Sequence, residues 1–284
     1  MSGLAVLVEG QGPRAVVLLH GVGGGRHIWG EEGSGTTTAL AEAGYTALAV
    51  DLPGYGDSDL SEHLTLSGMA QAVWETLEVR GIHEAVWVGH SMGGMVAQEA
   101  ALAHPQAVCA LVLACTSAAF GRSDGAWQQA FVRDRLAPLD QGNDMSQVAR
   151  KLVPGLVAPG ARPEALDMAM RLMSAVPVPT YRQAVSALVG FDSRSRLSQI
   201  TVPALCLAGD LDSTSPPEVL QRMAQRLPGG RYACLSKAGH IANLEQPEAF
   251  NQAVIDFLAE VAPASPSTLM GLEHHVQDSS HRRS

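Results

Sequence analysis

Basic side chains are scarce in this chain of 284 residues. It has 19 lysines and arginines against 28 aspartates and glutamates, which gives a formal net charge of −9. A protein that binds the phosphate backbone of a nucleic acid usually presents a clustered basic face, and the sequence shows no such cluster. We therefore expect no nucleic-acid partner.

Long apolar runs are also absent. No run reaches the roughly 18 residues that a membrane span requires, and residues 1–12 lack the basic region and apolar segment of a signal peptide. The sequence therefore predicts a cytoplasmic protein with no membrane partner. The oligomeric state is left open between a monomer and a homodimer.

Cysteine is rare, and its spacing excludes the common cysteine sites. Cys109, Cys115, Cys206 and Cys234 stand in apolar runs with no Cys-x-x-Cys spacing. This pattern favours reduced core residues over disulfides or zinc ligands. We therefore expect no metal site.

Hydrophobic residues make up 46% of the chain, which is enough to bury a sizeable core. Short apolar runs alternate with helical patterns, and this alternation predicts an α/β fold with a parallel sheet. The predicted strands are 4–9, 15–19, 45–50, 85–88, 108–114, 204–208 and 232–235, the first of them an antiparallel edge strand. The predicted helices are 67–79, 92–103, 217–226 and 247–260.

The alternation is interrupted over residues 118–190, where the pattern is helical and contains repeated prolines. We interpret this stretch as a helical cap inserted into an α/β core that comprises residues 1–117 and 191–262. The cap carries a net charge of +2, from eight basic and six acidic residues, whereas the remainder carries −11. Residues 263–284 have the composition of a disordered tail.

The segment G-H-S-M-G at residues 89–93 matches the G-x-S-x-G nucleophile elbow. It follows a predicted strand and begins a predicted helix, which is the context that this motif requires. The motif places Ser91 on a sharp turn, where its neighbours must be small. We therefore predict that Ser91 is a nucleophile.

A serine hydroxyl needs a base and a third group that orients the base. His240 follows the last predicted strand, so its loop reaches the same edge of the sheet as the elbow. The acid should lie between Ser91 and His240 in the sequence, and the loop after residue 208 offers Asp210 and Asp212. We prefer Asp212, with Asp210 as the alternative.

The run H-G-V-G-G-G at residues 20–25 follows a predicted strand and fits an oxyanion loop. We expect the amides of Val22 and Met92 to stabilise the negative oxygen of a tetrahedral intermediate. The glycines lack the Gly-Lys-Ser/Thr ending and the G-x-G-x-x-G helix start of phosphate-binding loops, which argues against nucleotide binding.

These motifs, together with D-L-P-G-Y-G-D-S at residues 51–58, resemble the α/β-hydrolase superfamily over about residues 4–261. The resemblance implies a mostly parallel eight-stranded sheet with helices on both faces, an inserted cap over the active site, and no cofactor. The segment 239–250 and the end of the cap resemble 3-oxoadipate enol-lactonases. Ser91 excludes the superfamily members that use an aspartate nucleophile.

The resemblance and the motifs together predict a serine hydrolase that cleaves a small carboxylic ester or lactone, with an enol-lactone or another carboxylated substrate as one candidate. The alternatives are a carbon–carbon bond hydrolase of ring-cleavage products and a ligand-binding module with little turnover. Candidate substrate-binding residues come from the cap and its end: Trp127, Phe131, Arg133, Arg135 and Met173. The two arginines are candidates for binding a substrate carboxylate.

Overall fold

The computed structural model describes residues 3–61, 63–121 and 125–264. Its centre is a seven-stranded sheet in the order β1-β3-β2-β4-β5-β6-β7. The strands are β1 (Val6–Glu9), β2 (Ala15–Leu19), β3 (Thr46–Val50), β4 (Ala85–His90), β5 (Val108–Ala114), β6 (Ala204–Gly209) and β7 (Gly230–Leu235). β1 pairs antiparallel with β3, and every other pairing is parallel. The predicted α/β fold and its antiparallel edge strand are confirmed.

The predicted count of eight strands is wrong for the part of the chain that the structure describes. A single short strand, β1, precedes β2, and the chain then turns at Gly10, whose φ of 83° is in the left-handed region. A side chain at Gly12 would collide with the carbonyl of Gly44. The described segment before β2 therefore has room for one strand and its turn.

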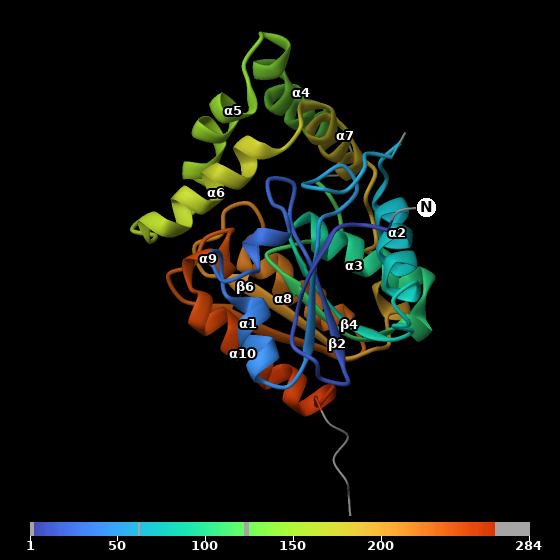
Figure 1. Ribbon diagram of the computed structural model, residues 1–284. Coiled ribbons are helices and arrows are strands. Elements are labelled where there is room, and N and C mark those ends of the chain that lie inside the picture. Colours follow the sequence, from blue (N-terminus) through green and yellow to red (C-terminus); the bar gives the residue numbers. More distant parts are fainter. Residues whose placement is uncertain (1–2, 62, 122–124, 265–284) are drawn as a thin grey trace, which may run out of the picture.

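Helices cover both faces of the sheet (Figure 1). They are α1 (Thr36–Glu42), α2 (Leu66–Glu78), α3 (Met92–Ala103), α8 (Pro217–Arg226), the short α9 (Ala242–Glu245) and α10 (Pro247–Val261). Because the central strands are enclosed on both faces, every residue of β2 and β4 is buried, as expected for parallel strands. Proline at the first position of α8 and α10 suits a helix start.

Four further helices lie together beyond the carboxyl ends of the parallel strands, in green to yellow at the top of Figure 1. They are α4 (Ala126–Asp140), α5 (Met145–Leu152), α6 (Pro163–Ala175) and α7 (Val178–Val189), and we call residues 118–190 the cap segment. Asp144 and Gln147 form a capping box that begins α5. The division of the chain into a core and a separate cap domain stays a prediction.

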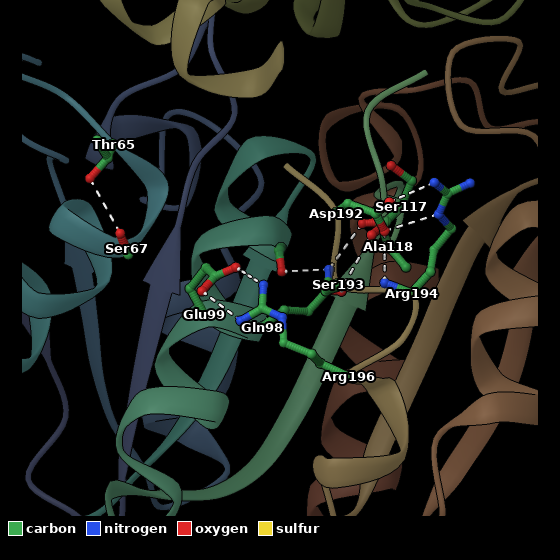
Figure 2. A network of polar contacts seen from close by, with 11 residues as sticks. Thr65, Ser67, Gln98, Glu99, Ser117, Ala118, Asp192, Ser193, Arg194 and Arg196 are labelled. Atoms are coloured by element: carbon green, nitrogen blue, oxygen red, sulfur yellow. Dashed lines mark hydrogen bonds and ion pairs between the residues drawn. The ribbon is translucent and has the colours of Figure 1, made fainter. Parts of the chain in front are cut away.

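The two ends of the cap segment meet beside α3 (Figure 2). The amide of Ser193 donates a hydrogen bond of 2.7 Å to the carbonyl of Ala118. The Ser193 hydroxyl lies 2.7 Å from Oε1 of Gln98, a buried residue of α3, and Nε2 of Gln98 donates to the carbonyl of Ser117 at 3.0 Å. The helix that follows Ser91 therefore also holds the entry and exit of the cap segment.

All four cysteines are free, but Cys234 is exposed and Cys109 is only half-buried, so the prediction of four core residues is wrong for these two. Cys234 lies on β7, an edge strand that pairs with another strand on one side alone.

Among the described residues, no helix is long and apolar enough to cross a membrane. Residues 265–284, most of the predicted tail, lie outside the described residues.

Candidate active site

The elbow holds Ser91 in a strained backbone conformation between β4 and α3. Its φ of 53° and ψ of −116° are rare for a residue with a side chain. The turn is closed by glycines, since a Cβ at Gly89 would collide with the backbone of Gly93, and one at Gly93 would collide with the carbonyl of Leu19. Thr116 donates a hydrogen bond of 2.7 Å to the Ser91 carbonyl. This turn projects the Ser91 hydroxyl toward the end of the sheet.

The imidazole of His240 lies between Ser91 and Asp212. Nε2 of His240 is 3.0 Å from the Ser91 hydroxyl, and Nδ1 is 2.9 Å from Oδ2 of Asp212. Because a carboxylate can only accept, Nδ1 carries the proton and Nε2 is free to accept from Ser91. Asp212 and His240 are only 3% and 6% exposed. The arrangement can move a proton from Ser91 to His240 and stabilise the resulting imidazolium.

The structure places Asp212, rather than Asp210, at the imidazole. The second oxygen of Asp212 accepts hydrogen bonds from the amides of Thr214 at 2.8 Å and Ser215 at 2.9 Å. These two bonds fix the carboxylate so that the other oxygen faces His240. Asp210 instead accepts from the amide of Ala238 at 3.1 Å, which ties two loops together.

Val22 lies in the loop that follows β2, and Met92, the first residue of α3, directly follows Ser91 in the elbow. Neither backbone amide donates a hydrogen bond within the described parts of the chain, so both are available to an oxyanion. Tyr55, from the segment at 51–58, donates from its hydroxyl to the Val22 carbonyl at 3.0 Å. His20 accepts from the Leu52 amide at 3.1 Å, and burial lowers its pKa. Tyr55 and His20 therefore help to hold the loop that carries Val22.

His90 supports the backbone of His240. Its Nε2 donates to the His240 carbonyl at 2.7 Å. Burial, followed by the neighbouring imidazole of His240, lowers the pKa of His90 to about 4. A neutral His90 avoids placing a second positive charge beside the imidazolium that would form on His240.

Glu245 is a structural residue of the site that the sequence did not reveal. It is 1% exposed, and its carboxylate accepts hydrogen bonds from the amides of Ala158 at 2.7 Å, Gly239 at 2.9 Å and Ile241 at 3.1 Å. Gly239 and Ile241 flank His240, whereas Ala158 belongs to the cap segment. Glu245 therefore joins the loop of the base to the cap segment. The only available signal was its place five residues after His240.

Ser91 and His240 open into a cavity of about 540 Å³ between the sheet edge and the cap segment. Trp127, Phe131, Arg135 and Met173, four of the five predicted substrate-binding residues, line it. Its walls are mainly apolar, and polar groups lie near Ser91, on the loop at Ser213–Ser215, and at Arg135 and Tyr181 of the cap segment. Such a cavity suits a small molecule with an apolar body.

Arg133 does not lie with the other candidates. It is absent from the cavity lining, its side chain is 69% exposed, and its Nε is 3.5 Å from Asp134. Residues two apart on a helix point in different directions, so α4 directs Arg133 and Arg135 to different faces. The geometry gives no support to substrate binding by Arg133.

No group of three or more histidine, cysteine or acidic side chains that could hold a metal ion occurs in the described ranges. The carboxylates nearest the site, Asp212 and Glu245, are occupied by backbone amides and by His240. The prediction that the protein needs no cofactor stays a prediction.

Residues 14–247 match the family model described as alpha/beta hydrolase fold. Since the match spans well over half of the chain, the chain belongs to the alpha/beta hydrolase fold family, and the α/β-hydrolase class of enzyme predicted from the sequence is confirmed. Among curated relatives, a pimeloyl-(acyl-carrier protein) methyl ester esterase from Citrobacter koseri is 32% identical over 254 residues, which cover 87% of this chain and 94% of the relative.

Solved structures of similar proteins agree with this assignment. A thermophilic esterase from Thermogutta terrifontis superposes with a TM-score of 0.82 and 26% identity, covering 91% of this chain and 93% of that one. An enol-lactonase from Burkholderia xenovorans gives a TM-score of 0.80 and 25% identity, covering 90% and 96%. The predicted resemblance to lactone hydrolases is thus shared with esterases.

Proposed function

We propose that this protein hydrolyses a small carboxylic ester or lactone through an acyl-enzyme formed on Ser91. The hydrogen-bonded chain from Ser91 through His240 to Asp212, at the floor of a mainly apolar cavity, is the observation that carries the proposal. Relatives named as a methyl ester esterase and an enol-lactonase support ester bonds as the target.

In the first half of the reaction, the Ser91 oxygen attacks the substrate carbonyl carbon while Nε2 of His240 takes the hydroxyl proton. The amides of Val22 and Met92 donate to the oxyanion of the tetrahedral intermediate, and loss of one such donor typically costs about 3 kcal/mol of transition-state stabilisation. His240 then gives its proton to the alcohol oxygen as the C–O bond breaks. The acyl group remains on Ser91.

In the second half, His240 takes a proton from water, and the resulting hydroxide oxygen attacks the acyl carbon. Collapse of the second intermediate breaks the bond to Ser91, whose oxygen recovers the proton from His240. An ester gives an acid and a separate alcohol, whereas a lactone gives a single hydroxy acid because its alcohol stays tethered.

We further propose that the cap segment acts as a separate unit that shields the acyl-enzyme from bulk water. This idea rests on its position over Ser91 and on the hydrogen bond from the Ala158 amide to Glu245. The cytoplasmic location, the lack of a nucleic-acid partner and the monomeric or homodimeric state stay predictions from the sequence.

The test is a burst-phase assay of the purified protein with short-chain p-nitrophenyl esters, run beside Ser91→Ala. We expect a burst of about one equivalent, and a serine-directed phosphonate should add once to the wild type and not to Ser91→Ala. Ser67→Ala is the matched control, because it replaces an exposed serine on the surface of α2, and it should leave the burst intact.

Absence of a burst, of an adduct and of any Ser91→Ala effect would contradict the proposal. Saturable ligand binding without turnover would then favour the ligand-binding module. Turnover of ring-cleavage products, with esters left intact, would favour the carbon–carbon hydrolase.

A further inference from the structure

One face of α4 presents three cavity-lining side chains at a spacing of four residues. Trp127 and Phe131 stack with ring centroids 5.4 Å apart and an interplanar angle of 29°. The Arg135 guanidinium carbon lies 4.7 Å from the centroid of the Phe131 ring. Residues four apart on a helix lie on the same face, so the three form an aromatic row that ends in a cation. We call this row the α4 ladder.

Arg135 is the only cavity-lining residue, among those described, that carries a permanent charge. No carboxylate of the described residues forms an ion pair with it, although Arg133 and Arg182 in the same segment contact Asp134 and Asp140. A cation in an apolar cavity with no acidic partner attracts an anionic ligand, because the surrounding medium screens charge less than water does. The charge of the cavity therefore selects for negative substrates.

Tyr181 completes the cation's surroundings. Tyr181 also lines the cavity, and although the positive charge of Arg135 lowers its pKa, the larger effect of burial raises it, so that the phenol stays protonated. A protonated phenol has a proton to donate to an anion. Together the two groups offer donors that fit the two oxygens of a carboxylate.

We propose that Arg135 and Tyr181 bind a carboxylate of the substrate, and that the preferred substrates are esters or lactones whose carboxylate is separated from the reacting carbonyl by a hydrocarbon stretch. That stretch lies against the α4 ladder and Met173. The proposal rests on the proposed function, since it places the ligand in the cavity of Ser91. It makes Arg135 a specificity-determining residue and gives it no part in the bond-breaking steps.

The carboxylate can belong to the acyl part or to the alcohol part of an ester, and two substrate pairs distinguish these sources. The acyl pair is the mono-p-nitrophenyl ester of glutaric acid and p-nitrophenyl valerate. The alcohol pair is 4-carboxyphenyl butyrate and 4-carbamoylphenyl butyrate. We expect the wild type to prefer the charged member of one pair, as judged by kcat/KM. Equal or opposite preference in both pairs overturns the proposal.

Substitution of the arginine separates recognition from structure. Arg135→Gln should lower the charged-to-neutral ratio of kcat/KM by about tenfold or more, as expected for the loss of a charge-assisted hydrogen bond, and should change turnover of the neutral ester much less. Arg135→Lys should restore part of the ratio, because it keeps the charge without the planar fork. Arg133→Gln, on the exposed face of the same helix, should leave the ratio unchanged.

A proportional loss for both members of a pair in Arg135→Gln would show a structural role and overturn the proposal. If the wild type cleaves no ester, the proposed function fails, and a calorimetric titration of the wild type with monomethyl glutarate tests the subsite by itself. Binding that weakens in Arg135→Gln but not in Arg133→Gln supports the carboxylate subsite, and no binding to the wild type overturns it.

Discussion

Replacement of Glu245 by glutamine should both destabilise the protein and slow its reaction. The variant keeps one carbonyl oxygen, which can still accept from the amides of Ala158 and Gly239, now without a full negative charge. Its new NH2 group faces the amide of Ile241, so that two donors meet where the carboxylate had accepted a bond of 3.1 Å. The change is nearly isosteric, so the effect comes from hydrogen bonding rather than from packing.

The expected size follows from the three bonds. A hydrogen bond to a charged group contributes about 1.5–3 kcal/mol. Loss of one bond and weakening of the other two therefore lowers the free energy of unfolding by about 2–4 kcal/mol. For a domain of this size, about 1 kcal/mol shifts Tm by roughly 2–4 °C, so Tm should fall by about 4–16 °C.

Thermal unfolding of Glu245→Gln measures this effect, with Glu248→Gln as the matched control. Glu248 is exposed in the first turn of α10, where its charge is worth at most about 1 kcal/mol. Because Glu245 holds both residues that flank His240, kcat should fall more than KM rises. A Tm within about 2 °C of the wild type, together with an unchanged kcat, would refute the reasoning.

Two further predictions concern the groups around the imidazole. Asp212→Asn should lower kcat by about 10³–10⁴-fold, because its NH2 group would face Nδ1 of His240 and favour the tautomer that cannot accept from Ser91. Asp210→Asn, the control, should change kcat little. Similar losses of kcat in both variants would contradict the assignment of Asp212 as the acid. The pKa of His90 is lowered from 6.5 to about 4, mainly by burial. Between these pH values the unfolded chain therefore binds more protons than the folded one, and the free energy of unfolding falls as the pH falls. Once the pH is below both values, the loss amounts to about 3 kcal/mol. In His90→Leu, urea unfolding at pH 7 and pH 4.5 should show a smaller loss of stability on acidification, and an unchanged loss would argue against this role of His90.

Local sequence patterns predicted the parts of the site that depend on local backbone geometry. The elbow at Ser91 is encoded by small residues within a few positions, and the bounds of α3 and β5 agree with the predicted ranges. Val22, Asp212 and His240 each follow a strand, so strand order and handed connections bring them to one edge of the sheet.

Other features depend on contacts between distant segments, which one sequence does not reveal. Arg133 and Arg135 have the same chemistry and neighbouring positions, and only the rotation of α4 against α7 decides which one faces the cavity. Glu245 resembles a surface glutamate until the loop of Ala158 is folded over it. The exposure of Cys234 depends on β7 being the last strand of the sheet.

The joined ends of the cap segment have a consequence for how this protein can change. Ser193 is bound to Ala118 and to Gln98, and Gln98 is bound to Ser117, so the chain leaves the sheet and returns to it at one point. A segment inserted at such a point can be lengthened, shortened or exchanged for another with little cost in closure entropy, because its ends are already together. The aromatic row and Arg135 are carried on this exchangeable segment, whereas Ser91, Asp212 and His240 lie outside it. Selectivity can therefore be remodelled by transplanting one contiguous stretch of chain, provided that the new stretch keeps the backbone at Leu156 and Ala158 that binds the loop of His240.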